Sequence, residues 1–214
     1  MAGKVIIFDF DGTVADTLNV ILGIANGAAE EFGYKRVSRE EVEELKGLTP
    51  RQIIKQSGIS IFKVPFILRR IKTELNKQIQ YISPFSGMKE ALIKLNQQGH
   101  ILGIITSNSE ENVMDFLEIN GLKDLFEFVY SGTTIFGKSK VIANCLRKGN
   151  FSPEDVIYVG DETRDIEAAK KTQIKVISVG WGFNLPVALA KMEPDFLIHQ
   201  PEELVEAIAS LPDK

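Results

Sequence analysis

Two aspartates separated by one residue are the strongest candidates for chemistry in this chain. Asp9 and Asp11 lie in the segment Asp-Phe-Asp-Gly-Thr, residues 9–13. On an extended segment, side chains two residues apart project from the same side, so both carboxyl groups could reach one substrate. One carboxylate could attack phosphorus while the other protonates the leaving oxygen and then activates water, which suits phosphoryl transfer. Gly12 allows the chain to turn away and exposes backbone N–H groups to an anion.

Polar residues also follow three other apolar runs, at the points where strands would end. They are Thr106, Ser107 and Asn108 after residues 101–105, Lys138 in the loop after residues 126–130, and Asp161 with Asp165 after residues 156–159. In open parallel sheets, ligands bind at the carboxyl ends of the strands. We therefore expect these groups to gather with Asp9 and Asp11 at one edge of a sheet.

Four carboxylates at one edge of a sheet would repel one another strongly without compensation. A divalent cation and one lysine would supply most of the compensating positive charge. Ligands that offer only oxygen favour Mg²⁺ over zinc or copper. The four aspartates therefore predict a bound Mg²⁺ ion.

The elements that would position these residues are short, unbroken apolar runs. Such runs are typical of strands that are buried on both faces, as in a parallel sheet covered by helices. The candidate strands are residues 5–8, 101–105, 126–130, 156–159, 176–179 and 196–198. Helical segments at 88–98 and 110–120, each followed by glycine, alternate with them. This alternation predicts an α/β fold with a doubly wound, Rossmann-like parallel sheet.

Residues 17–83 interrupt this alternation with helix signals and no convincing strand. Ser38 with Glu41 has the spacing of a capping box, and Thr49-Pro50 is typical of a helix start. An apolar stripe then runs from Val64 to Ile82, and the cations beside it, Lys72 among them, are interpreted as a solvated face. We therefore predict a core domain of residues 1–16 and 84–214 with an inserted helical domain at 17–83.

With four motifs in order at strand ends, the chain resembles the haloacid dehalogenase superfamily of hydrolases, in particular its phosphoglycolate phosphatase-like members with a helical cap. Asp9-Phe-Asp-Gly-Thr13 resembles the first motif, Thr106 the second, Lys138 the third, and Gly160-Asp161 with Asp165 the fourth. The helical insert lies between the first two motifs, where that family places its cap. The resemblance implies a phosphatase that acts on a small phosphorylated metabolite.

The resemblance also implies a role for each matching residue. Asp9 would be the nucleophile and Asp11 the general acid and base. Mg²⁺ would be held by Asp9, the backbone carbonyl of Asp11 and Asp161, with Asp165 supporting the site directly or from behind. Thr106 and the amides beside it, including that of Ser107, would hold phosphoryl oxygens together with Gly12. Lys138 would counter charge, although Lys140 also follows the third strand.

The insert offers one candidate for substrate selection. Lys46 and Arg51 flank a loop between two expected helices. By resemblance to sugar-phosphate members with a similar loop, these side chains could contact the far end of the substrate. Solvent-facing cations at a helix junction are an equally good interpretation.

Three alternatives stay open at this point. Residues 132–139 match the P-loop pattern in full, which would indicate a nucleotide-binding protein but would leave Asp9, Asp11 and Thr106 without a role. A phosphomutase would use the same aspartates and exclude water by tighter cap closure. A response-regulator-like receiver would carry its phosphorylated aspartate on a later strand and lack the insert. A catalytically inactive binding module would not need the complete set of Asp9, Asp11, Thr106, Lys138 and Asp161.

The overall composition is that of an ordinary globular protein, 44% hydrophobic and 25% charged. A net charge of −4 argues against non-specific binding to DNA or to an anionic membrane. The apolar runs are far shorter than the ~20 residues of a membrane span, and a signal-peptide pattern is missing. The single cysteine, Cys145, excludes a multi-cysteine metal site. We therefore expect a cytoplasmic monomer or homodimer without nucleic-acid or membrane partners.

Overall fold

A parallel β-sheet lies at the centre of the larger part of the computed structural model, which describes residues 3–131 and 137–211. Within these residues the strands are β1 (Val5–Phe8), β2 (Ile101–Ile105), β3 (Phe128–Tyr130), β4 (Val156–Gly160), β5 (Lys175–Val179) and β6 (Phe196–Ile198). They pair in the order β3-β2-β1-β4-β5-β6, and every pair is parallel. The predicted doubly wound α/β sheet is confirmed.

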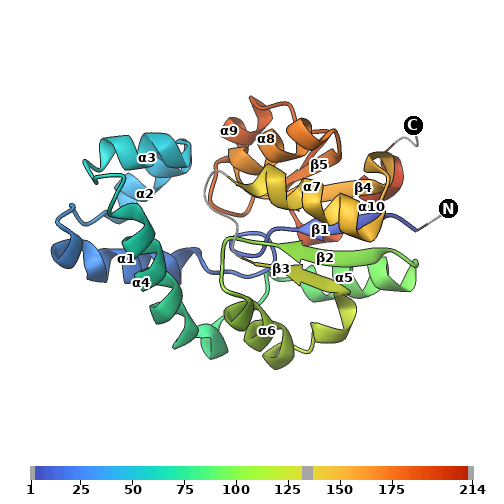
Figure 1. Cartoon of the computed structure of the whole chain (residues 1–214), viewed down its shortest axis with the longest axis horizontal. Coiled ribbons are helices and arrows are strands. Elements are labelled where there is room, and N and C mark those ends of the chain that lie inside the picture. The colour runs from blue at the N-terminus through green and yellow to red at the C-terminus, as the bar shows by residue number, and fades with distance from the viewer. Residues whose placement is uncertain (1–2, 132–136, 212–214) are drawn as a thin grey trace.

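Helices cover both faces of this sheet (Figure 1). One face packs against α5 (Met88–Gln97), α6 (Glu110–Ile119) and α10 (Leu204–Ser210), and the other against α7 (Lys138–Gly149), α8 (Thr163–Thr172) and α9 (Pro186–Ala190). In β1, Ile6 and Phe8 belong to the first core, whereas Val5 and Ile7 belong to the second. Burial on both faces explains why the strands are unbroken apolar runs.

The described residues also form short 3-10 helices, namely η1 (Ile79–Tyr81), η2 (Lys123–Leu125), η3 (Pro153–Asp155) and η4 (Pro201–Glu203). The turn η2 explains why β3 begins at Phe128, two residues later than the apolar run at 126–130 suggested.

None of the helices in the described ranges is long and apolar enough to cross a membrane. Cys145 on α7 is buried, and burial raises the pKa of its thiol to about 11, as expected of an inert core cysteine.

The strand order reverses at β1. From β1 the chain moves outward through β2 and β3, and α7 then returns it to the other side of β1, where β4 lies. The carboxyl ends of β1 and β4 are therefore neighbours at the point where connections leave in opposite directions. Open α/β sheets bind their ligands at such a point.

A block of helices lies beside the sheet, on the side away from both chain ends (Figure 1). It contains α1 (Leu18–Phe32), α2 (Arg39–Lys46), α3 (Pro50–Gln56) and α4 (Val64–Asn76), followed by η1. The predicted capping box at Ser38 and Glu41 is present, and Thr49 caps α3 through the backbone N–H of Gln52. We call these helices the cap.

Two chain segments that join the cap to the sheet lie side by side. The backbone N–H of Asp16 donates to the carbonyl of Ser83 at 3.1 Å, and that of Phe85 donates to Val14 at 3.2 Å. Between these bonds, Ala15 and Pro84 form an antiparallel bridge. Because both connections lie at one place, a rotation of the cap relative to the sheet would bend the chain only there.

Candidate active site

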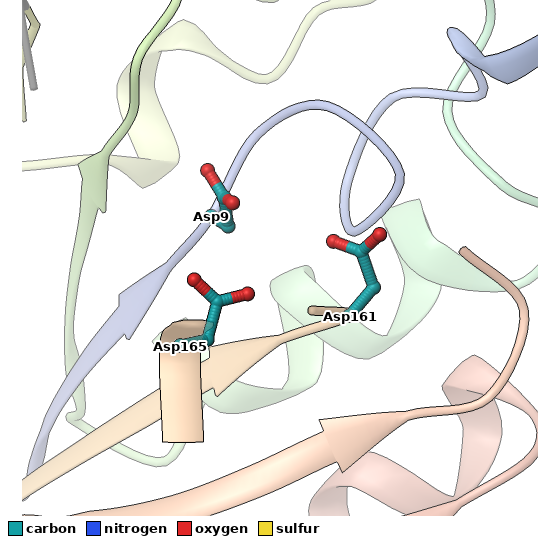
Figure 2. Close-up of side chains that lie close together, drawn as sticks. All are labelled: Asp9, Asp161 and Asp165. Carbon is teal, nitrogen blue, oxygen red and sulfur yellow. The ribbon is translucent and has the colours of Figure 1, made fainter. Parts of the chain in front are cut away.

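Three aspartates from different elements meet at the carboxyl ends of β1 and β4 (Figure 2). Asp9 follows β1 directly, Asp161 follows β4, and Asp165 lies in the first turn of α8. Each offers a carboxylate oxygen within 4.8 Å of the other two. Figure 2 shows their carboxyl groups facing a common space, and all three are at most 2% exposed.

Lys138 holds two of these carboxylates together. Its Nζ lies 2.6 Å from Oδ2 of Asp9 and 2.5 Å from Oδ1 of Asp165. Burial lowers the pKa of this lysine, but the negative charges of Asp165 and Asp9 outweigh burial and raise it well above its usual range. Lys140 is exposed, so the structure places Lys138 rather than Lys140 against the aspartates.

Asp161 is fixed by the loops around it. Its Oδ1 accepts a hydrogen bond from Oγ1 of Thr13 at 2.7 Å, and its Oδ2 accepts one from the backbone N–H of Phe183 at 2.7 Å. Burial, together with the charges of neighbouring carboxylates, raises the pKa of Asp161 well above its usual value. A buried acid with this surrounding charge releases its proton readily only when a cation is supplied.

Backbone conformation and close packing require glycine at position 12. Gly12 adopts a φ of +78°, and a Cβ there would lie 2.4 Å from Oδ2 of Asp161, so only glycine fits. Its backbone N–H donates to the carbonyl of Ala15 at 3.0 Å, so the amide expected to face an anion has a partner within the loop.

Asp11 lies outside the three-carboxylate cluster and contacts a residue that follows β2. The side-chain amide of Asn108 donates to both of its oxygens, at 3.1 and 3.0 Å. Burial and the charge of Asp9 raise the pKa of Asp11 to about 7, against the opposing effect of the hydrogen bonds from Asn108. A carboxyl group with a pKa near 7 can give and take a proton at neutral pH, as a general acid and base must.

Thr106 and Ser107 complete the row of strand ends at β2. Thr106 is fully buried, and its Oγ1 accepts the backbone N–H of Asn108 at 3.0 Å. Ser107 is half-buried beside it. The structure thus brings Asp9, Asp11, Asp161, Asp165 and Lys138 to the edge where these two residues lie.

The described residues fit a hard divalent cation. Asp9 and Asp161 offer oxygen atoms in a buried, strongly negative space, which is the donor set that Mg²⁺ or a similar ion prefers. Both oxygens of Asp165 already accept hydrogen bonds, from Lys138 at 2.5 Å and from the backbone N–H of Glu162 at 3.0 Å. That arrangement favours a supporting place for Asp165 behind the cation.

Arg164 is a residue of the site that sequence reasoning missed. Its Nη2 lies 2.5 Å from Oε1 of Glu162, and its Nε is buried without a hydrogen-bond partner. Its positive charge also lowers the pKa of Asp11. The signal was present in the sequence, because Arg164 stands between Asp161 and Asp165 in the first turn of α8.

Lys72 of α4 is a second missed cation. It is half-buried, unlike the exposed Arg69 and Arg70 of the same helix, so its assignment to a solvated face is wrong. Burial lowers the pKa of Lys72, and the negative charge of Asp11 opposes that effect. A cation of the cap therefore faces the carboxyl group of Asp11.

Asn184 ties the cap loop to the sheet domain. Its side-chain amide donates to the carbonyls of Lys46 and Leu48 at 2.9 and 3.1 Å, and its Oδ1 accepts the backbone N–H of Thr163 at 2.9 Å. Lys46 also lines a cavity of about 450 Å³, which residues of the cap form together with Glu162, Phe183 and Asn184 of the sheet domain. Arg51, by contrast, is exposed on α3 and does not line that cavity.

The P-loop interpretation falls largely on residues that the structure does not describe. Residues 132–136 of the matching segment lie outside the described ranges. The lysine of the motif, Lys138, contacts Asp9 and Asp165, as described above.

Comparisons with known proteins agree with this geometry. Residues 6–179 match the family model described as haloacid dehalogenase-like hydrolase. A phosphoglycolate phosphatase from Synechococcus elongatus is 35% identical over 97% of this chain and 98% of its own length. A pyrophosphatase from Listeria innocua is 25% identical over 97% of this chain and 98% of its own.

Solved structures share the fold. A predicted phosphatase from Clostridium acetobutylicum superposes with a TM-score of 0.84 at 19% identity, covering 99% of this chain and all of the other. A predicted phosphoglycolate phosphatase from Haemophilus somnus has a TM-score of 0.77 at 21% identity, covering 96% and 98%. With the family model spanning most of the residues and the site residues in place, this chain belongs to the haloacid dehalogenase-like hydrolases.

Proposed function

We propose that this chain is a Mg²⁺-dependent phosphatase that hydrolyses a small phosphomonoester through a phosphoryl group carried on Asp9. The substrate is of the phosphoglycolate or sugar-phosphate type, and the Synechococcus relative is named a phosphoglycolate phosphatase. The observation that carries the proposal is the arrangement of two carboxyl groups with different environments. Asp9 is buried against Lys138, whereas Asp11 has a pKa of about 7.

In the first half of the reaction, a carboxylate oxygen of Asp9 attacks phosphorus, and the bond from phosphorus to the ester oxygen breaks. Asp11 gives its proton to that ester oxygen, so the substrate leaves as a neutral alcohol and Asp11 becomes a carboxylate. The backbone next to Thr106 and the ammonium group of Lys138 support the negative charge of the transferring group. The phosphoryl group then remains on Asp9.

In the second half, a water molecule attacks the phosphorus of the phosphorylated Asp9. Asp11 takes a proton from this water, the bond to Asp9 breaks, and inorganic phosphate leaves. Asp9 is restored as a carboxylate and Asp11 as a carboxylic acid, so the cycle closes.

Asp9, Asp161 and the backbone carbonyl of Asp11 would hold the metal, with Asp165 behind them. When bound, Mg²⁺ supplies positive charge that lets a phosphate dianion approach these carboxylates. Asp161 keeps its orientation through Thr13 and Phe183.

We also propose that residues 17–83 form the cap domain of this enzyme and that the paired segments around Ala15 and Pro84 are its hinge. A small substrate bound at the strand ends would be covered by the loop that carries Lys46. Lys46 therefore remains our candidate for contact with the far end of the substrate. Arg51, exposed on α3, is the weaker of the two candidates.

A phosphate-release assay tests the proposal directly. Purified protein is incubated with phosphoglycolate, a panel of sugar phosphates and p-nitrophenyl phosphate, with Mg²⁺ or with EDTA. We expect Mg²⁺-dependent release that Asp9→Asn abolishes, because an amide is a far poorer nucleophile and ligand. Full activity in EDTA, or more than about 1% residual activity in Asp9→Asn, would contradict the proposal. Transfer of phosphate to a second position of a sugar phosphate, without release, would identify a mutase instead.

A further inference from the structure

A chain of three asparagines, two of them buried, connects the cap to the carboxyl group of Asp11. Asn108, after β2, donates to both oxygens of Asp11. Asn112, in the first turn of α6, donates from Nδ2 to Oδ1 of Asn108 at 2.9 Å and to the backbone carbonyl of Lys72 on α4 at 3.1 Å. Asn76, one turn further along α4, donates to Oδ1 of Asn112 at 2.8 Å. The path from cap helix to Asp11 is therefore continuous.

The orientation of each amide in this path is fixed by its neighbours. Asn112 has two N–H donors and uses one on Asn108 and one on Lys72, while its oxygen accepts from Asn76. A reversed amide would place oxygen against two acceptors. Asn112 is 1% exposed, so water cannot easily replace a lost partner.

Asn108 is oriented in the same way. Its Oδ1 accepts from Asn112 and from the backbone N–H of Ser109 at 2.8 Å, which leaves its two N–H groups for Asp11. If Asn112 were removed, one of the two contacts that hold this oxygen away from Asp11 would be lost. Asn108 is 3% exposed and would then have more than one orientation available.

We propose that Asn112 is a positioning residue that aligns Asp11 for proton transfer only when α4 is seated on α6. This inference rests on the proposed function, because it requires Asp11 to be the general acid. The side-chain amide of Asn112 has partners for both of its N–H donors and for its oxygen only when the cap is in place. With α4 displaced, Asn112 loses its partners Lys72 and Asn76, and the orientation of Asn108 loosens.

The test compares two substrates of nearly equal size whose leaving groups differ. Phenyl phosphate needs the proton from Asp11 because phenolate is a poor leaving group, whereas p-nitrophenyl phosphate needs it far less. For Asn112→Ala we expect kcat/KM for phenyl phosphate to fall at least about tenfold, a fraction of the full effect of a general acid. For p-nitrophenyl phosphate the fall should stay under about threefold, because kcat/KM reports only steps up to phosphorylation of Asp9.

Asn120→Ala is the matched control. Asn120 also lies at α6 and donates to a carbonyl at the end of the cap, that of Ile82 at 3.4 Å, as well as to Phe116 at 2.9 Å. It makes none of the contacts with Asn108. We expect this variant to leave the ratio of the two kcat/KM values unchanged. An equal change of that ratio in both variants would overturn the inference.

Further variants separate the possible failures. If Asn112→Ala does not fold, Asn76→Ala removes one of the two contacts between Asn112 and α4, and the same selective loss in phenyl phosphate hydrolysis is expected. An unchanged ratio there would overturn the inference. Asp11→Asn must show the leaving-group dependence itself; if it does not while the wild type hydrolyses both substrates, the role proposed for Asp11 fails. A wild type inactive on both substrates would contradict the proposed function instead.

Discussion

At the scale of single residues, the site is a balance of buried charges in which each cation has a definite place. Lys138 lies between Asp9 and Asp165, and Arg164 lies against Glu162. The two cations approach the aspartates from different elements, since Lys138 begins α7 and Arg164 belongs to the first turn of α8. The charge left over by these pairs is negative, and a bound cation would compensate it.

Replacement of Arg164 should change the affinities of the site for Mg²⁺ and for inorganic phosphate in opposite directions. Arg164→Met removes a positive charge beside the aspartates, so we expect tighter Mg²⁺ binding and weaker inhibition by inorganic phosphate. The loss for phosphate should be about tenfold or more, the equivalent of a hydrogen bond between charged groups. Steady-state kinetics at varied Mg²⁺ and phosphate concentrations measures both constants.

Arg147→Met serves as the control for this prediction. Arg147 makes a hydrogen bond to the uncharged side chain of Asn144 at 3.1 Å on the exposed surface of α7. Arg147→Met changes the net charge by the same amount as Arg164→Met, at a residue away from the cluster of Asp9, Asp161 and Asp165. If Arg147→Met shifts both constants as far as Arg164→Met does, the effect belongs to overall charge and not to the place of Arg164.

At the scale of elements, two sets of polar contacts help to seat the cap on the sheet domain. Asn184 binds the loop after α2 to the start of α8, and Asn112 binds α4 to α6. Hydrogen bonds suit such a contact because each one contributes little net stability and can be exchanged for water when the elements separate. A cap that must open for substrate needs contacts of this kind.

Loss of the first contact should weaken substrate capture without affecting the chemistry of the strand ends. Asn184→Ala removes the donors to the carbonyls of Lys46 and Leu48. We expect kcat/KM for the best natural substrate to fall about tenfold, which corresponds to one or two hydrogen bonds, with most of the change in KM. Activity on p-nitrophenyl phosphate, which needs mainly the phosphate site, should change by less than about threefold.

Asn26→Ala is the appropriate comparison for Asn184→Ala. Asn26 makes equally good contacts, donating to the carbonyl of Val37 at 2.9 Å and accepting its N–H at 2.8 Å, but both partners belong to the cap. This variant should lower the melting temperature and leave the kinetic constants close to those of the wild type. Equal kinetic losses in the two variants would show that cap stability, rather than cap seating, governs substrate capture.

At the scale of the whole molecule, the buried carboxyl groups link stability to pH and to metal. The pKa of Asp11 is raised to about 7 and that of Asp165 to about 6, from an ordinary value of 3.8. Between these values the folded, metal-free protein holds protons that the unfolded chain releases. Stability must therefore fall as pH rises from the unfolded pKa values through the folded ones.

The metal-free protein should accordingly be more stable to urea at about pH 5 than at about pH 7.5, by at least about 1 kcal/mol. Mg²⁺ favours the ionised carboxylates, so its stabilising effect should grow over the same range. Urea unfolding at both pH values, with Mg²⁺ and with EDTA, measures the two effects. Asp161→Asn should reduce both; a pH dependence of the opposite sign in the wild type would contradict this account.

The sequence by itself determined the fold and the candidate residues that directly follow strands. Residues 5–8 and 156–159 are apolar throughout because both faces of the sheet are covered, and that pattern is local. Asp9 and Asp161 follow these runs directly, so their meeting at one edge was implied by the parallel topology. The capping residues Ser38 and Thr49 were equally local signals.

Only the tertiary structure decided which polar side chains join these residues. Asn184 contacts Lys46 across 138 positions, and Asn108 contacts Asp11 across 97. Lys72 faces Asp11 although its place beside an apolar stripe indicated solvent. Local patterns report whether a face is buried, because burial follows the period of a helix or strand. They do not report which partner a buried polar group finds, because that depends on how separate elements pack and on satisfying every donor and acceptor at once.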